Sequence, residues 1–146
     1  MKANHVSFDS NILIYAVDKD AKGKHDIALQ LIVESATIDS ALSLQSLSEF
    51  FYVITRKGKI STKAALEHIQ DWQTIFPTIT AKPTTLGHAI ALMEKHHLAF
   101  WDSMMLATAR EAGVTTLFSE DFQHGQILDG VRIVNPFMHR ERAHHK

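Results

Sequence analysis

Four carboxylates in this chain stand where one predicted element gives way to the next. Asp9 and Asp121 each follow a short apolar segment with the composition of a strand, which ends at Phe8 and Phe118. Glu49 and Asp102 instead fall near the start of segments with helical apolar spacing. In a parallel sheet covered by helices, the ends of strands and the starts of the helices that follow lie at the same edge. We therefore expect the four acids to gather there, where their repulsion would be severe without a cation.

Carboxylate ligands of this kind favour a hard divalent cation. Mg²⁺ commonly takes one or two carboxylates together with waters and substrate phosphates. The chain contains no cysteine, which excludes thiolate nucleophiles, disulfides and Cys-based zinc or iron–sulfur sites. We predict a shared Mg²⁺ or Mn²⁺ site in which Asp9 and Asp102 are the main ligands. Glu49 and Asp121 would complete the site directly or through water.

Each acid also has a structural explanation that stays open. Asp9 is a favoured helix N-cap residue, because its oxygens accept amide hydrogens at the start of a helix. Glu49 fits a capping box that begins at Ser46. Asp102 in a first helical turn is stabilised by the helix dipole. A shared cation has the advantage of explaining all four acids together.

Small polar residues beside the aspartates are expected to hold them in place. We predict supporting hydrogen bonds from three side chains: Ser10, Asn11 and Ser119. Glu120, although adjacent to Asp121, should point away from the site, and we interpret it as a surface residue.

The elements that must position these acids alternate along the chain. We expect strands at about residues 5–8, 41–44, 77–81, 115–118 and 131–134. Helices are expected at about residues 11–17, around 28–36, and at 46–56, 62–75, 84–97 and 100–112. This order predicts an α/β fold with a central parallel sheet of four or five short strands flanked by helices. It would form a single domain over residues 1–138, followed by a basic C-terminal tail at 139–146.

Length and composition are those of one globular domain. The chain has 146 residues, of which 45% are hydrophobic. No apolar run approaches the roughly 18 residues of a membrane-spanning helix, and the N-terminus lacks the pattern of a secretory signal, so we expect a cytoplasmic protein. The net charge of −1 argues against a strongly basic nucleic-acid binder. With four acids neutralised in a metal site, however, the remainder is net positive, and a nucleic-acid partner stays open.

Four segments of the chain resemble PIN-domain ribonucleases, specifically the VapC-like toxins of bacterial toxin–antitoxin modules. The segments, in the order of that family, are FDSNILIY (8–15), LSEFFYVITRK (47–57), WDSMM (101–105) and FSEDFQHG (118–125). The resemblance covers nearly the whole chain and implies a PIN-like three-layer fold. It also implies a metal-dependent endoribonuclease whose catalytic acids correspond to Asp9, Glu49, Asp102 and Asp121. The Ser-Met-Met sequence after Asp102 departs from the smaller residues frequent in the family, which bears on the shape of the pocket.

A ribonuclease of this kind would hydrolyse RNA phosphodiesters to 5′-phosphate and 3′-hydroxyl ends, since water is the nucleophile. Basic side chains should neutralise the RNA phosphates, and the candidates are Arg56, Lys57, Lys59 and Arg110. The resemblance further implies a homodimer and a VapB-like antitoxin partner. That partner would present an Arg to the acidic pocket, because a guanidinium binds carboxylates bidentately.

Other functions stay open from the sequence. A PIN-like RNA-processing nuclease without a toxin role would have the same acids. A non-catalytic acidic scaffold would bind a partner protein through the apolar helix around Phe50, Phe51 and Tyr52. A histidine-based nuclease fits poorly, because the ten histidines are scattered; His124 is its best candidate.

Overall fold

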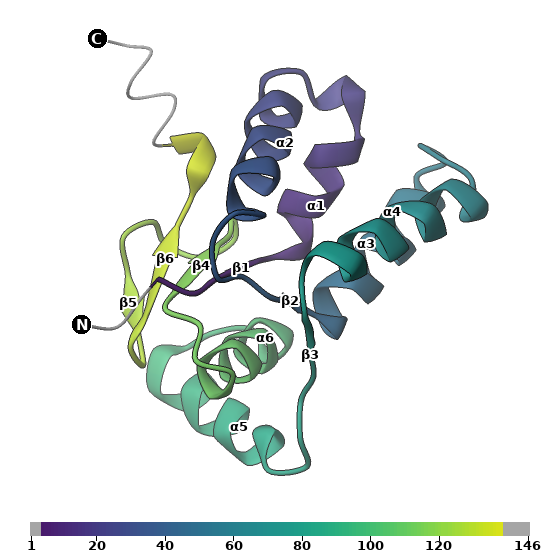
Figure 1. Cartoon of the computed structure of the whole chain (residues 1–146). Helices are drawn as coiled ribbons and strands as arrows, with labels where there is room; N and C mark the ends of the chain where they lie inside the picture. Colours follow the sequence, from purple (N-terminus) through teal and green to yellow (C-terminus); the bar gives the residue numbers. More distant parts are fainter. Residues whose placement is uncertain (1–3, 139–146) are drawn as a thin grey trace, which may run out of the picture.

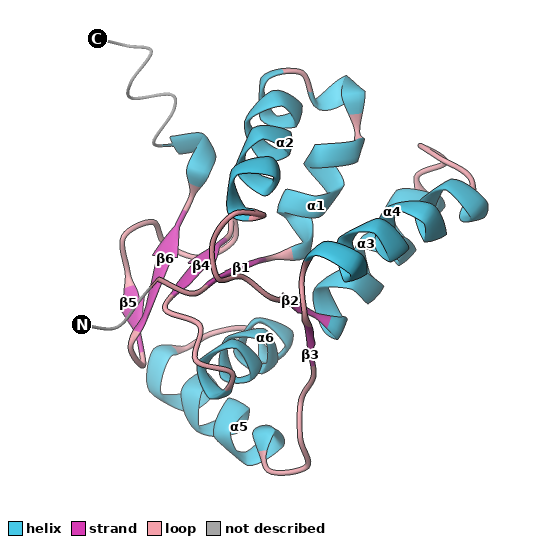
Figure 2. Ribbon diagram, viewed as in Figure 1, coloured by secondary structure: helices cyan, strands magenta, loops and turns pink. Residues whose placement is uncertain are grey.

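Helices and strands alternate along the chain as predicted (Figures 1 and 2). This computed structural model describes residues 4–138, so the predicted tail at 139–146 lies outside the described residues. The strands are β1 (Val6–Phe8), β2 (Leu42–Ser43), β3 (Thr78–Ile79), β4 (Thr116–Phe118), β5 (Ile127–Leu128) and β6 (Val131–Val134). The helices are α1 (Ser10–Val17), α2 (Gly23–Ser35), α3 (Leu44–Arg56), α4 (Thr62–Ile75), α5 (Thr85–His96) and α6 (Phe100–Glu111), with a 3₁₀ helix, η1 (Lys19–Ala21), between α1 and α2. Between residues 4 and 138, none of the helices has both the length and the apolar character needed to cross a bilayer.

The central sheet has four strands in the order β1-β4-β6-β5. Strands β1, β4 and β6 are parallel to one another, and β5 is antiparallel to β6. The short strands β2 and β3 form a separate parallel pair, which a single bridge between Val6 and Ser40 places beside β1. The predicted α/β fold with a central sheet of four or five strands is therefore confirmed, although the sheet is mostly rather than wholly parallel because β5 runs antiparallel to β6.

Strand β5 was not predicted from the sequence. It forms a hairpin with β6 through Asp129 and Gly130, whose φ angles of 50° and 83° are left-handed. An Asp-Gly pair favours this turn, because both positions of a type I′ hairpin turn need positive φ. The Asp-Gly pair could have predicted this hairpin from the sequence. Strand β5 has only two residues, however, which is too short to give a recognisable strand pattern.

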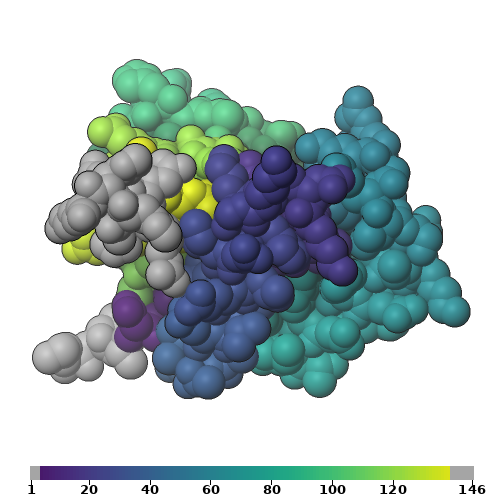
Figure 3. All heavy atoms as spheres, turned by 90° about the horizontal axis from the view of Figure 1, so that it is seen from above, coloured from purple at the N-terminus to yellow at the C-terminus, as the bar shows by residue number. Residues whose placement is uncertain are grey.

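The sheet lies between two helical layers, each with its own hydrophobic core. Helices α1 and α2 cover one face and α5 and α6 cover the other (Figure 1). The first core joins β1 to α1, α2, α3 and α4 and includes the fully buried Phe8 and Phe50. The second packs α5 and α6 against β4, β5 and β6 and includes Leu117 and Ile133. In the view from above, α1 and α2 (purple to blue) lie beside α3 and α4 (Figure 3).

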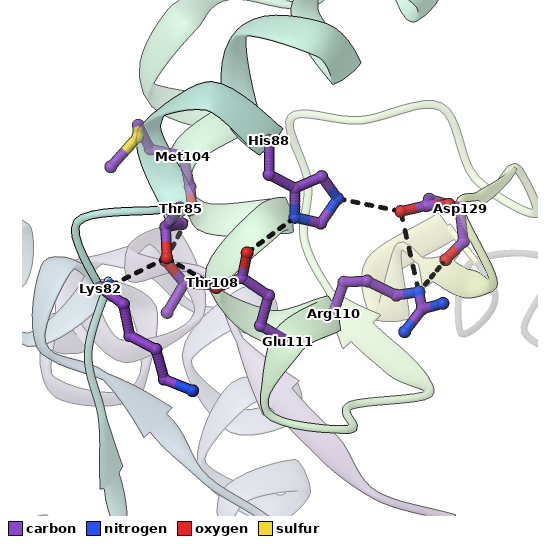
Figure 4. Close-up of polar contacts among 8 residues, drawn as sticks. All are labelled: Lys82, Thr85, His88, Met104, Thr108, Arg110, Glu111 and Asp129. Atoms are coloured by element: carbon purple, nitrogen blue, oxygen red, sulfur yellow. Dashed lines mark hydrogen bonds and ion pairs between the residues drawn. The ribbon is translucent and has the colours of Figure 1, made fainter.

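A polar network fastens α5 and α6 to the β5–β6 hairpin (Figure 4). The His88 ring lies between two acids, with Nδ1 2.9 Å from Glu111 Oε2 and Nε2 3.1 Å from Asp129 Oδ2. Arg110 Nε donates to the backbone carbonyl of Asp129 at 2.7 Å. Burial lowers the pKa of His88, but hydrogen bonds with the two acids outweigh it and raise the pKa above its ordinary value. The network therefore holds α5 and the last turn of α6 against the hairpin.

Candidate metal centre

The carboxyl ends of β1 and β4 meet side by side at one edge of the sheet. In the parallel register Phe8 lies next to Phe118, and the Asp9 amide donates to the Phe118 carbonyl at 2.9 Å. The residues that follow each strand, Asp9 and Ser119, therefore face each other. Ser119 Oγ donates to Asp9 Oδ2 at 2.7 Å.

Asp9 is the most buried acid of this edge, with 2% of its surface exposed. Its Oδ1 accepts the Ser10 amide hydrogen at 2.7 Å, and the residue is the N-cap of α1. Capping and membership of the acidic site are therefore compatible roles. Burial, opposed by the hydrogen bond from Ser119 and reinforced by the negative charge of Asp121, raises the pKa of Asp9 to about 7.

Three acids from distant parts of the chain converge at this point. One carboxylate oxygen from each of Asp9, Asp102 and Asp121 lies within 4.8 Å of the other two. Asp102 comes from the first turn of α6, as predicted, and Asp121 follows β4. Burial and the charges of Asp121 and Glu49 raise the pKa of Asp102. Close carboxylates in a partly buried place are stabilised by a cation.

Glu49 lines the same cavity but is not a member of the group of three. Its charge contributes to the raised pKa values of Asp9 and Asp102. The capping box that the sequence suggested for Glu49 is wrong, because α3 begins at Leu44 and Ser43 is its N-cap. Ser46 instead donates its hydroxyl to the Phe8 carbonyl at 2.9 Å, which fastens α3 to the end of β1.

The acids line an open cavity of about 490 Å³. Its lining residues are Asp9, Ser10, Ser48, Glu49, Tyr52, Val53, Asp102 and Asp121. Two oxygens on opposite sides of a Mg²⁺ ion are about 4.2 Å apart, since each Mg–O distance is about 2.1 Å. Three oxygens within 4.8 Å of one another are thus close to the spacing that one ion bridges, and an all-oxygen donor set suits a hard cation. The residues present fit a divalent metal.

The sequence model of the PIN domain matches residues 6–127, a range that contains all four acids. This chain belongs to the PIN domain family. The predicted resemblance to that family is therefore confirmed. A comparison with curated protein sequences gave no significant match.

Solved structures share the fold of this PIN domain at low sequence identity. A toxin–antitoxin complex from Klebsiella pneumoniae superposes with a TM-score of 0.66 at 21% identity, covering 90% of this chain and 97% of the other. VapC20 from Mycobacterium tuberculosis, a sarcin–ricin loop cleaving toxin, superposes with a TM-score of 0.63 at 16% identity, covering 80% of this chain and 91% of the other. VapBC2 from Rickettsia felis, bound to a DNA fragment from its promoter, superposes with a TM-score of 0.63 at 16% identity, covering 88% of this chain and 96% of the other. At these identities the likeness concerns the fold.

Of the three predicted supporting residues of the PIN domain, Ser119 is the one that contacts two of the clustered acids. Besides donating to Asp9, its Oγ accepts the Asp121 amide hydrogen at 3.1 Å, so one hydroxyl holds two of the clustered acids. Ser10 supports Asp9 through its amide, with its Oγ 3.4 Å from Asp9 Oδ1. Asn11 is turned toward the Glu120 backbone amide at 3.5 Å. Its Nδ2 is buried without a hydrogen-bond partner among the described residues.

Glu120 points away from the cluster, as expected. It accepts the hydroxyl hydrogen of Tyr15 at 2.6 Å and forms an ion pair with Lys24. His124 also has a structural role, because its Nδ1 accepts the Asn135 amide hydrogen at 3.0 Å. These contacts tie the segment after β4 to α1, α2 and the end of β6.

The predicted RNA-binding cations are dispersed in the structure. None of Arg56, Lys57, Lys59 and Arg110 is among the described residues that line the acidic cavity. Lys59 pairs with Asp18 and Asp20. Arg110 is in the last turn of α6, about 12 Å along the axis from Asp102 at a rise of about 1.5 Å per residue. It is held by Asp129 there, so its assignment to the rim of the site is corrected.

Sequence reasoning missed several residues that complete the site on α3. Ser48, Tyr52 and Val53 line the cavity with Glu49, and Gln45 Nε2 lies 3.3 Å from Glu49 Oε2. Residues three and four positions from Glu49 share its helix face. That spacing was the signal that would have identified Gln45, Tyr52 and Val53.

Proposed function

We propose that this PIN domain is a divalent-metal-dependent endoribonuclease that acts as the toxin of a toxin–antitoxin pair. The observation that carries the proposal is the convergence of Asp9, Asp102 and Asp121, with their oxygens within 4.8 Å of one another. The toxin–antitoxin proteins among its structural neighbours support the biological role. One of them is described as cleaving the sarcin–ricin loop.

The three clustered aspartates would hold a Mg²⁺ or Mn²⁺ ion, and Glu49 would complete its surroundings directly or through water. When bound, the ion lowers the pKa of water and neutralises charge on the attacked phosphate. Ser10 and Ser119 fix the Asp9 carboxylate by hydrogen bonds to its two oxygens, so that it is in place before the ion arrives. With water as nucleophile, the products carry 5′-phosphate and 3′-hydroxyl ends.

The partners of this protein would be an RNA substrate, an antitoxin and a second copy of the chain. An antitoxin Arg in the acidic cavity would replace the cation by a bidentate pair with the carboxylates. The structural neighbours from Klebsiella pneumoniae and Rickettsia felis are themselves toxin–antitoxin assemblies. The RNA of such a toxin lies in the cytoplasm, where we expect the protein to act.

Cleavage of RNA with Mn²⁺, with EDTA, and by the variant Asp9→Asn tests the proposal. We expect cleavage by the wild type with metal, none in EDTA, and a loss of at least roughly 100-fold in Asp9→Asn, in line with the removal of a group essential to catalysis. Asp71→Asn, an exposed acid of α4, is the matched control and should cleave normally. Activity that survives EDTA and Asp9→Asn, or products with 2′,3′-cyclic phosphate ends, would refute metal-assisted hydrolysis by these acids.

A further inference from the structure

Two large aromatic side chains stand exposed next to the acidic cavity. Tyr52 is 60% exposed and Trp101 is 61% exposed. The chain has only two tryptophans, and the other, Trp72, is packed in the first core with 7% of its surface exposed. Because these two rings are exposed, packing in the hydrophobic core does not explain why they lie beside the acids.

Tyr52 belongs to the acidic cavity itself. It lies one helical turn after Glu49 on α3 and lines the cavity with it. Arg56 lies one turn further and places its guanidinium carbon 5.6 Å from the centre of the Tyr52 ring. With the guanidinium over one face of the ring, the other face can stack on a base while the cation neutralises a phosphate, which suits a nucleotide.

Trp101 lies directly before Asp102 and is held in place from two sides. Its ring packs edge-on against Phe100, with centroids 5.0 Å apart. Gln45 Nε2 donates to the Trp101 carbonyl at 2.9 Å and lies 3.3 Å from Glu49 Oε2, so one amide links α3 to the start of α6. The hydrogen bond anchors the Trp101 backbone and Phe100 packs against the indole, so the indole loses less conformational freedom on binding a ligand than a side chain without these contacts.

Trp101 lines a second cavity, of about 420 Å³, that adjoins the acidic one. Leu44, Gln45 and Met104 contribute to its walls, and Ser48 lines both cavities. The two cavities therefore share Ser48 as a wall, with the acids lining one and Trp101 lining the other. A chain whose phosphate lies over the acids can place a neighbouring base against the indole.

On the basis of the proposed ribonuclease function, we propose that Trp101 and Tyr52 are stacking platforms for unpaired bases next to the scissile phosphate. The substrate is then a single-stranded RNA segment, because bases within a duplex are already stacked and do not offer their faces. Stacking on aromatic side chains tolerates any base. The rings thus select for unpaired structure.

Steady-state cleavage of a single-stranded RNA with one cleavage site tests the proposal. Trp101→Leu and Tyr52→Leu should each lower kcat/KM roughly 5- to 150-fold, the range for one stacked base, mainly through KM. Val33→Ala on α2 is the matched control, because Val33 is 62% exposed and lies outside both cavities. Removing the base next to the scissile phosphate should slow the wild type by a similar factor and leave Trp101→Leu or Tyr52→Leu without further loss.

The outcomes separate this inference from the proposed function. If the wild type does not cleave RNA with Mn²⁺, the ribonuclease proposal fails and the stacking proposal fails with it. If the wild type cleaves but neither the two variants nor the abasic RNA change kcat/KM, only the stacking proposal is overturned. It is also overturned if the variants leave cleavage intact and change only the mass measured by sedimentation, which would assign the rings to a protein interface.

Discussion

Asp9 combines two properties that oppose each other. Both of its oxygens accept hydrogen bonds, which favour the charged carboxylate, yet burial and the neighbouring acids raise its pKa to about 7. Without a cation, the folded protein therefore holds Asp9 in an unfavourable place at neutral pH. Perturbed carboxylates of this kind are typical of functional sites.

The substitution Asp9→Asn is expected to stabilise the metal-free protein while it abolishes activity. The pKa of Asp9 rises from 3.8 to about 7 on folding, so the charge lowers the free energy of unfolding as pH rises through this window. At about 1.4 kcal/mol per pKa unit the cost reaches at most about 4 kcal/mol above pH 7. Urea denaturation in EDTA at pH 5 and pH 8 should show the advantage of the variant widening with pH. If the variant and the wild type differed in free energy of unfolding by the same amount at both pH values, the raised pKa of Asp9 would not be the cause.

The substitution Ser119→Ala is expected to weaken metal binding more than it weakens the fold. The Ser119 hydroxyl lowers the pKa of Asp9 and also holds the Asp121 amide, so its loss favours protonation of Asp9 and releases two of the proposed metal ligands. Partners of metal ligands typically contribute 10- to 100-fold in affinity, and we expect about that loss for Mn²⁺ by calorimetry. Ser61→Ala, which removes the N-cap of α4, should instead cost about 1 kcal/mol of stability with unchanged affinity. Undiminished Mn²⁺ binding by Ser119→Ala would show that Ser119 has no part in the site.

At the scale of elements, the sequence predicted the positions of most of the acids relative to strands and helices. Apolar segments that end one residue before Asp9 and three residues before Asp121 identified β1 and β4, and the apolar spacing after Asp102 identified α6. The start of α3 was not predictable in the same way, because Ser43 and Ser46 are both good N-cap residues. A tertiary contact, from Ser46 to the carbonyl of Phe8, decides between them.

The His88 network should make the attachment of the β5–β6 hairpin dependent on pH. Burial lowers the pKa of His88, and the hydrogen bonds to Glu111 and Asp129 raise it above 6.5 overall. Its stabilisation is therefore complete below pH 6.5 and is lost as pH rises through the folded-state pKa. We expect His88→Ala to cost about 0.5–1 kcal/mol more at pH 6 than at pH 9, since the network is partly exposed. Urea denaturation measures this difference, and a loss independent of pH would exclude a charged His88.

At the scale of the whole molecule, the site depends on the order of the strands. Because β1 and β4 are parallel neighbours, the residues after them meet although they are far apart in the sequence. Helix α6 brings Asp102 to the same place from the opposite layer (Figure 1). The alternating pattern of elements predicted the sheet, but the sequence does not contain the distances between side chains. For that reason, only the structure showed that Glu49 lies outside the group of three aspartates and that Arg110 lies away from the acidic cavity.

Calorimetric titration of the metal-free protein with Mn²⁺ at pH 8 tests most directly whether the clustered aspartates form a metal centre. We predict saturable binding by the wild type, the same binding by Asp71→Asn, and a strong loss of affinity in Asp102→Asn. The last variant keeps the fold of the first turn of α6 but removes one of the three oxygens. No binding at millimolar Mn²⁺, or undiminished binding by Asp102→Asn, would contradict the metal centre and leave the acidic cavity as a surface for a protein partner.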